Sequence, residues 1–543
     1  MKKLLLSFFI FTIALFPQST PGLDSIFNNY VALRSGLLPD GQPGTIKQKC
    51  GLPSLSPLVL HFNSLKPDQQ ATLKSLTARP VKDTSVVSPK KRFRIHFDKS
   101  GFEKPDYSPD SFAVALDSAW EYEVNFLKYA APPSDGDLGG DSLYDVYIVA
   151  FQYWYGETVP ENPVTPFSDT YTSYIRIDND FSGFYTTGLP AAKVTAAHEF
   201  HHAIQMGSYI LRYADTFFHE LTSTSMEEFV FPEINDYLGY LSEYFDEPWL
   251  SLSKYSGYNL ATWNLMLRDR FGVEIIRRQW ELMPRQRAMR AIYNTLSQEG
   301  SSAVNEFNTF GIWNYFTNYR AVPGSYFKDA DKFPAIRNTM KSGLMGNSAI
   351  VSVVSHPVAN NQLTISNTQP GFNDTIVTIV TDFSVEEWES SPEKWLNYRY
   401  EFFTYNADGS SPLAGSYHDK FTGNTSWRYA TSVIINSILV KRGEISGSDD
   451  DFPRPSPFVY GKTAEDVIYF PFKFLKDLTA LLNIYDISGN LVYDGSEVPH
   501  GVLRDRIKWR VRDNSGGRLN SGVYIFHIKS ESDQKTGKIT VIN

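Results

Sequence analysis

Residues 195 to 205 contain the pattern His-Glu-x-x-His and read Thr195-Ala196-Ala197-His198-Glu199-Phe200-His201-His202-Ala203-Ile204-Gln205. Because Pro190 can open a helix and Gly207 can end it, we expect the pattern to lie on a helix. Residues four apart share one helix face, so the imidazoles of His198 and His202 can meet one ion at about 2.0–2.1 Å. Glu199 lies beside that face and can act as general base toward a water on the ion. The pattern therefore predicts a zinc site.

A third ligand is expected downstream of the histidine pair. In the metzincin peptidases a Gly follows the second His by three residues and a further His follows by six. This chain has Gln205 and Ser208 at those positions, which excludes that class. The intervening residues 203–219 suffice for the end of one helix, a turn and the start of a second helix. We therefore expect this second helix to bring Glu220 beside the pair.

The residues around Glu220 resemble the second motif of the gluzincins, in particular the aminopeptidase-N family, which reads Asn-Glu-Gly-Phe-Ala-Thr-x-x-Glu. Aligned at Glu220, the chain keeps the Thr at Thr224 and the Glu at Glu227, but it departs at Leu221 and Thr222. The close match covers about thirty residues. The resemblance implies an α+β gluzincin-like fold, with zinc bound by the two histidines and Glu220.

A broader likeness covers roughly residues 90 to 330. This part of the chain is similar to secreted bacterial peptidases in which His-Glu-Phe-x-His-Ala-Ile-Gln is followed by a Glu and then by Met-Glu-Glu. Aminopeptidases also carry Gly-x-Met-Glu-Asn before the metal helix to hold a free amine, and none precedes His198 here. The resemblance therefore implies an endopeptidase acting on proteins or peptides. Residues 173–178 are expected to form an edge strand that pairs with an extended substrate.

Three further side chains near the motif need a role. Tyr255 and Tyr258 precede the next predicted helix and are candidate donors to the transition-state oxyanion, with ordinary packing as the alternative. His201 lies only three positions from His198. The pair four apart is preferred as ligands because it leaves Glu199 over the water. We therefore expect His201 either to support the site from behind or to lie at the surface.

The chain has one cysteine, Cys50, so no disulfide within it can form. It stands in Lys49-Cys50-Gly51-Leu52-Pro53, which resembles the cysteine switch of matrix metalloproteinase pro-segments, Arg-Cys-Gly-Val-Pro, although those enzymes are metzincins. A thiolate binds zinc at about 2.3 Å and would occupy the position that the water needs. Cys50 is therefore a candidate latency switch. The alternative is a small buried apolar residue.

The N-terminal residues 1–22 combine two lysines, an apolar run from 4 to 16 and small residues, which predicts a signal peptide and export. Residues 23–91 are either a pro-region that ends at an exposed basic linker or an arm packed on the next domain. Residues 92–335 are the predicted metallopeptidase domain. It has strands at 93–97, 145–149 and 174–177, a helix at 111–129, and mostly helices after Glu220. This order, with strands before helices, is typical of an α+β unit.

Period-two alternation in residues 345–445 predicts a β-sandwich. An acidic, Pro-rich linker follows at 446–458. Residues 459–543 place glycines between alternating strands and resemble the immunoglobulin-like sorting domains of type IX secretion substrates and hook-capping proteins. That resemblance implies secretion machinery as a partner and an extracellular or cell-surface location. The alternative is a structural β domain.

The net charge of −9 has no long run of either sign, so nucleic acid is not expected as a partner, and no later stretch could span a membrane. The acidic stretch 135–141 is a candidate calcium loop, although such loops are more often solvated turns. Two functions remain open. One is a zinc endopeptidase, and the other is a surface adhesion or structural protein whose peptidase-like domain is inactive. Retention of all three ligands and of Glu199 favours the enzyme.

Overall fold

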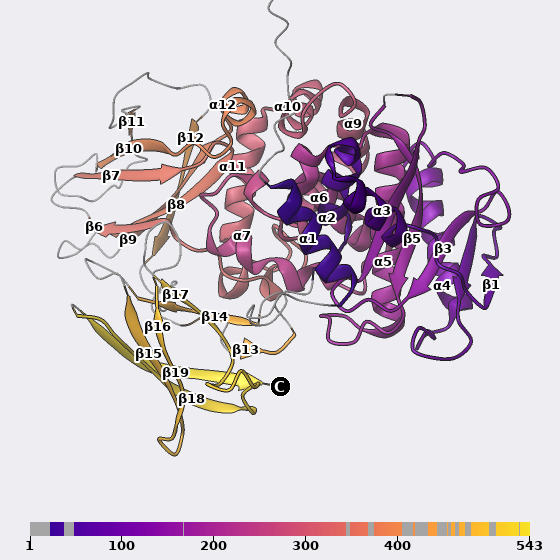
Figure 1. The fold of residues 1–543 in the computed structure, drawn as a ribbon. Helices are drawn as coiled ribbons and strands as arrows, with labels where there is room; N and C mark the ends of the chain where they lie inside the picture. The colour runs from indigo at the N-terminus through magenta and orange to yellow at the C-terminus, as the bar shows by residue number, and fades with distance from the viewer. Residues whose placement is uncertain are drawn as a thin grey trace, which may run out of the picture.

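The computed structural model of the chain describes residues 22–36, 48–166, 168–343, 348–366, 374–403, 416–418, 433–441, 453, 458–461, 466–472, 479–498, 506–531 and 533–542. Residues 1–21 of the predicted signal peptide and most of the predicted linker lie outside this part. Within it, the chain folds into several bodies of helices and sheets (Figure 1). The expected multidomain organisation is confirmed.

A five-stranded mixed sheet lies at the centre of the first body. Its strands, in spatial order, are β1 (Thr84–Val87), β2 (Phe93–Phe97), β3 (Tyr144–Val149), β5 (Tyr171–Asp178) and β4 (Gly156–Pro163). The inner strands β2, β3 and β5 are parallel, whereas β1 and β4 run antiparallel to their neighbours. The three strands expected from alternation at 93–97, 145–149 and 174–177 all lie in this sheet.

The predicted edge strand is wrong. Residues 173–178 belong to β5, which lies between β3 and β4, so the edge of the sheet is β4. Pro160 and Pro163 hid this strand from sequence reasoning, because proline lacks a backbone N–H and is depleted in strands. An edge strand tolerates proline, since one of its sides has no strand partner to receive a hydrogen bond.

Helix α5 (Gly188–Ile204) packs against the sheet, α4 (Pro109–Trp120) and α6 (Thr216–Val230). All of its residues from Val194 to Ile204 are buried, so the helix is enclosed on every side rather than amphipathic. The expected helix at 111–129 ends earlier, with a π turn at 121–126 after α4. The later helices are α7 (Ser242–Asp246), α8 (Ala261–Phe271), α9 (Glu274–Leu282), α10 (Ala288–Gln298), α11 (Ala303–Tyr315) and α12 (Val385–Ser390).

The N-terminal arm packs on this body through α1 (Leu23–Arg34), α2 (Leu52–Leu60) and α3 (Pro67–Leu76). Its apolar side chains form a core with Tyr147, Trp154 and Tyr174 of the sheet region. Residues 85–87, expected in a linker, instead lie in β1, and the exposed Lys90 and Lys91 occupy the turn before β2. The arm is therefore integrated into the fold as the structure describes it.

Two sheets follow the helices. One contains β7 (Ser348–Ser355), β10 (Leu396–Phe403) and β11 (Ser416–His418), and the other contains β6 (Met340–Gly343), β8 (Ala359–Ser366), β9 (Asp374–Asp382) and β12 (Val433–Lys441). Val377, Ile379 and Phe383 share one core with the helices before them. The middle β region is thus packed onto α11 rather than separated from it.

The last body has a core of its own. Its strands are β13 (Phe458–Val459), β14 (Val467–Pro471), β15 (Ala480–Asp486), β16 (Leu491–Glu497), β17 (Arg506–Arg510), β18 (Gly522–Lys529) and β19 (Gln534–Ile542). The nearly buried Arg506 contacts the first body, with Nη2 2.8 Å from Glu247 Oε1. In the described part of the chain, no helix has the length and apolar character that crossing a membrane requires.

Candidate metal centre

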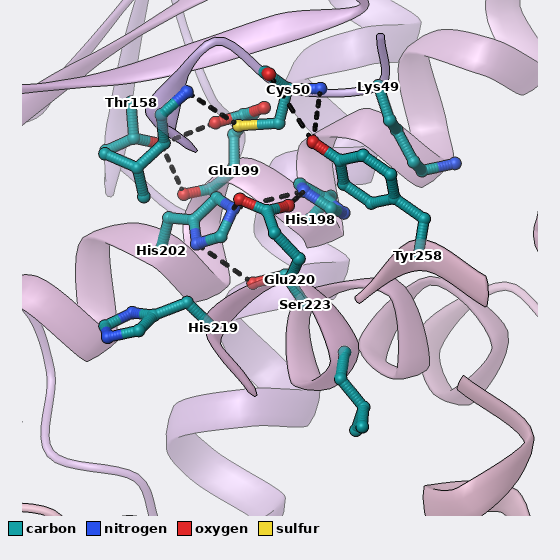
Figure 2. Close-up of polar contacts among 12 residues, drawn as sticks. Lys49, Cys50, Thr158, His198, Glu199, His202, His219, Glu220, Ser223 and Tyr258 are labelled. Carbon is teal, nitrogen blue, oxygen red and sulfur yellow. Dashed lines mark hydrogen bonds and ion pairs between the residues drawn. The ribbon is translucent and has the colours of Figure 1, made fainter. Parts of the chain in front are cut away.

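The donor atoms of the three predicted ligands converge between α5 and α6 (Figure 2). His198 Nε2 lies 3.1 Å from His202 Nε2 and 3.1 Å from Glu220 Oε2, and His202 Nε2 lies 3.3 Å from Glu220 Oε1. Ligands held at about 2.0–2.1 Å in a tetrahedral site are about 3.3 Å apart. Cys50 joins this group, since one donor atom from each of the four residues lies within 4.8 Å of all the others. This buried group could hold a metal ion.

The outer nitrogens of both histidines are hydrogen-bonded. His198 Nδ1 lies 2.7 Å from Glu227 Oε1, and His202 Nδ1 lies 2.8 Å from Gln205 Oε1. An acceptor at Nδ1 retains the ring proton there and leaves the Nε2 lone pair available to a cation. Both rings therefore present the nitrogen that binds a metal to the centre of the group.

Gln205 ties the two ligand helices together. It follows α5 in the π turn Gln205–Tyr209, and its Nε2 donates to the carbonyl of His219 at 3.1 Å and to Thr222 Oγ1 at 2.7 Å on α6. Its Oε1 also lies 3.0 Å from His219 Nδ1. This one amide therefore fixes the end of α5 against the turn of α6 that carries Glu220.

The charges of the group suit a cation. Burial would lower the pKa of His198, but its hydrogen bonds to Glu220 and Glu227 raise that pKa to about 9. Burial would raise the pKa of Glu220. The charge of His202 and the hydrogen bonds from His198 and His202 instead lower this pKa to about 2. The neighbouring carboxylates thus favour a proton on His198, and a bound metal ion would replace it.

Glu199 is buried beside the donor group on α5. Its Oε2 lies 2.7 Å from Thr158 Oγ1 of β4, and burial raises the pKa of the carboxyl. A Cβ at Gly156 would approach Glu199 Cγ to 2.9 Å and Thr195 Cγ2 to 2.8 Å. The absence of a side chain at Gly156 therefore lets β4 cross directly over Glu199.

Cys50 reaches the group from the N-terminal arm, which passes the start of β4 and makes an isolated parallel bridge with Gly156. Gln48 N donates to Tyr153 O at 2.8 Å, Tyr155 N donates to the carbonyl of Lys49 at 3.1 Å, and Gly51 N donates to Gly156 O at 3.0 Å. Burial raises the pKa of the Cys50 thiol well above its usual range, and Glu199 and Glu220 raise it further. The residues adjoining Cys50 thus pair with the segment that leads into β4 and with its first residue.

The two candidate tyrosines differ in position. The Tyr258 hydroxyl accepts from Cys50 N at 3.2 Å, and its ring centre lies 6.1 Å from that of His198. Gly257 before it has φ of 105°, and a Cβ there would collide with Phe217 O at 2.2 Å. This backbone conformation, which favours glycine, brings Tyr258 against α6.

Tyr255 faces another part of the fold. Its hydroxyl donates to the carbonyl of Glu247, and its ring packs on Tyr244. The expectation that Tyr255 supplies an oxyanion donor is therefore wrong for this conformation. Gly257, which lies between the two tyrosines, has a positive φ. Tyr255 and Tyr258 therefore face different parts of the fold although they are close in sequence.

Two further expectations are corrected by burial and pairing. His201 is fully buried, with Nδ1 2.7 Å from Glu123 Oε2, which excludes the surface alternative, and it lies outside the donor group, as expected. In the candidate calcium loop, Asp135 pairs with Arg79 and Asp141 pairs with Arg94. Carboxylates already held by guanidinium groups are poor calcium ligands, so the loop lends no support to calcium.

Several residues that shape the site had weak or no sequence signals. Glu227 had a weak signal. It follows Glu220 by seven residues, and residues seven apart on a helix share one face. Gln205 follows His202 by three residues, but an amide has many uses at such a position. Thr158 lies on the strand that the prolines concealed. The side chain of Lys49 gave no hint of burial, since lysine is rarely buried unless paired.

Comparisons with known proteins add little. No protein family matches the chain, and no curated protein matches it. One similar solved structure is PorZ, described as an essential bacterial surface component of the type IX secretion system of Porphyromonas gingivalis, with 14% identity and a TM-score of 0.14 over 31% of this chain and 29% of PorZ. Another is the neural ectodermal development factor IMP-L2, with 9% identity and a TM-score of 0.12 over 38% of this chain and 89% of that one. The chain thus spans less than a third of PorZ, and scores this low do not identify a fold.

Proposed function

We propose that this chain is a zinc-dependent endopeptidase of gluzincin type, with His198, His202 and Glu220 as zinc ligands. The observation that carries the proposal is the spacing of the three donor atoms, 3.1, 3.1 and 3.3 Å, beside the Glu199 carboxylate. Zinc in such a site lowers the pKa of a water to about 7 and polarises a carbonyl.

The remaining chemistry belongs to the side chains of the protein. Glu199 accepts the proton of the attacking water and passes it to the leaving amine, and burial raises its pKa, which makes the carboxylate a stronger base. Thr158 holds one oxygen of that carboxylate at 2.7 Å and so fixes its orientation. Tyr258 is the donor for the oxyanion once its hydroxyl is released from Cys50.

The path of the N-terminal arm supports action on internal peptide bonds. Residues 48–51 pair by backbone hydrogen bonds with Tyr153, Tyr155 and Gly156, where the chain enters β4, and the arm then continues past the donor group into α2. An extended substrate would use the same N–H and C=O groups at the start of β4 by β-augmentation. Room for chain on both sides of the donor group suits an endopeptidase rather than an exopeptidase.

The same arm suggests latency. The Cys50 thiol can serve as a fourth ligand, and the residues beside it cover the backbone groups that substrate needs. The backbone N–H of Cys50 also donates to the Tyr258 hydroxyl, which engages the hydroxyl proposed for the oxyanion. In this conformation the full-length protein would bind zinc but exclude water and substrate. Activation then requires displacement or cleavage of the arm near Cys50.

The test is metal analysis of the purified full-length protein together with casein digestion, with and without a chelator. Cys50→Ser should raise the rate of digestion by at least about tenfold, which corresponds to a competing contact worth about 1.4 kcal/mol. Cys50→Ala should do the same, and chelation should abolish both activities. A Cys50→Ser protein no more active than wild type would mean that the thiol is not the blocking ligand. A zinc-bound protein that is inactive in every form would favour the adhesion or structural protein instead.

We also infer that the protein is exported and that its last domain directs secretion. The support is the N-terminal signal pattern and the separate core of residues 458–542. Deleting the chain from Phe458 onward should leave zinc binding intact and change where the protein accumulates, as measured by fractionating cells and medium. The deletion exposes the partners of Arg506, so Arg506→Ala in the full chain serves as control for the lost contact. Unchanged delivery of the truncated protein would exclude a sorting role.

A further inference from the structure

Lys49, the residue before Cys50, fills a closed acidic pocket. Its side chain is only 1% exposed, and its Nζ pairs with Asp236 and lies 2.8 Å from Glu227 Oε2. The ammonium also faces the rings of Tyr240 and Tyr155, with Nζ 4.7 and 5.1 Å from the ring centres. The Tyr155 hydroxyl in turn lies 3.2 Å from Asp236 Oδ1. Two carboxylates and two aromatic faces thus surround one ammonium group.

The walls of this pocket come from outside the arm. Glu227 belongs to α6, Asp236 and Tyr240 belong to the short helix Asp236–Tyr240, and Tyr155 immediately precedes β4. When the arm leaves β4, as the proposed activation requires, these four side chains remain in place. Two buried carboxylates would then lack their cation, and removing one partner of a buried ion pair typically costs about 3–5 kcal/mol. The emptied pocket therefore favours a new cationic occupant.

The pocket also lies at the right place, beside the start of β4. Successive side chains of an extended segment point to opposite sides. Accordingly the side chains of Cys50 and Lys49 leave the arm in different directions (Figure 2). Cys50 Sγ lies in the donor group, and Lys49 Nζ lies between Glu227 and Asp236. A substrate bound along the same strand would place one side chain in this pocket beside the bond at the metal. Glu227 joins the two sites, because its other oxygen binds His198 Nδ1 at 2.7 Å.

We propose that the pocket formed by Glu227, Asp236, Tyr155 and Tyr240 is the specificity pocket of the enzyme and that it selects a lysine side chain adjacent to the scissile bond. This inference rests on the proposed peptidase function and deepens it. A compact ammonium matches the two facing carboxylates, and the pocket already encloses a side chain of lysine length. In the full-length protein, Lys49 imitates the substrate side chain while Cys50 blocks the metal.

The first experiment measures binding in the full-length protein without relying on turnover. Lys49→Ala removes three methylene groups and the ammonium, and n-propylammonium supplies the same groups. This amine should therefore raise the melting temperature of the variant, whereas n-propanol, which lacks the charge, should not. Wild type, in which Lys49 fills the pocket, should not respond to either compound. Adding Asp236→Asn to Lys49→Ala should remove the response to the amine. Equal responses to the amine and the alcohol would overturn the proposal.

The second experiment measures selectivity and still decides the question if Lys49→Ala does not fold. The Cys50→Ser protein, in which the arm no longer has its thiol contact to hold it at the site, is given two peptides in excess that displace the arm and differ only in lysine or norleucine, which has a similar shape without the ammonium. The lysine peptide should have a kcat/KM at least about 100-fold higher, because a site with buried polar groups strongly rejects a ligand that leaves them unpaired. Asp236→Asn should reduce this ratio at least about tenfold. Asp236 is chosen over Glu227 because Glu227 also orients His198.

A matched control is Glu228→Gln, a buried carboxyl on α6 outside the pocket and the donor group, which should leave the ratio unchanged. Cleavage of both peptides at equal rates would overturn the specificity pocket and leave the endopeptidase standing. Cleavage of neither peptide would overturn the endopeptidase and the pocket's role in specificity with it.

Discussion

Glu199→Gln is expected to abolish casein digestion while zinc remains bound. The substitution keeps the shape of the side chain and leaves His198, His202 and Glu220 untouched, but an amide cannot accept the proton of the attacking water. General-base catalysis contributes about 10²–10⁴-fold, so the rate should fall at least to that extent. The measurement is casein digestion by Cys50→Ser protein with and without Glu199→Gln, alongside zinc content.

The control for this substitution is Glu228→Gln in the same background. Burial raises the pKa of Glu228 to about 8, so this group is largely uncharged at neutral pH and its amide replacement changes little. The control should retain both zinc and activity. Digestion by Glu199→Gln as fast as by its parent would exclude Glu199 as the base and with it the proposed mechanism.

Glu220→Ala is expected to remove zinc, activity and a large part of the stability of the first domain. A ligand at a thousand times its dissociation constant stabilises the folded state by about 4 kcal/mol. For a domain of this size that corresponds to roughly 8–16 °C in melting temperature. The measurement is the melting temperature with zinc and with chelator. Chelator should lower the melting temperature of wild type by this amount. The melting temperature of Glu220→Ala should be the same with zinc and with chelator.

His202→Ala should behave like Glu220→Ala, because each removes one of the three donors that face the centre. Glu228→Ala, a truncation of a neighbouring buried carboxyl on α6, controls for the cavity that any shortened side chain leaves. It should lower the melting temperature in zinc but keep the response to chelator. Full zinc occupancy in Glu220→Ala would point to a different third ligand.

The sheet and its helices were predictable where the signal was local. Alternation located β2, β3 and β5, because half-buried strands place apolar residues at every second position. It did not locate β4, whose prolines are tolerated only because it lies at an edge, and an edge is a property of the assembled sheet. The error in the edge strand followed directly, since a strand pattern does not state which neighbours the strand acquires.

The sequence by itself determined the core of the candidate site. His198, Glu199 and His202 share a helix, where spacing fixes which side chains meet, and Glu220 needed only one turn and a second helix. Only the tertiary structure decided the rest. It brought Lys49 and Cys50 beside the start of β4 across more than a hundred residues, separated Tyr258 from Tyr255, and enclosed a lysine between Glu227 and Asp236. The physical reason is that helical neighbours follow from a fixed period, whereas contacts between distant segments depend on the order and packing of the whole sheet.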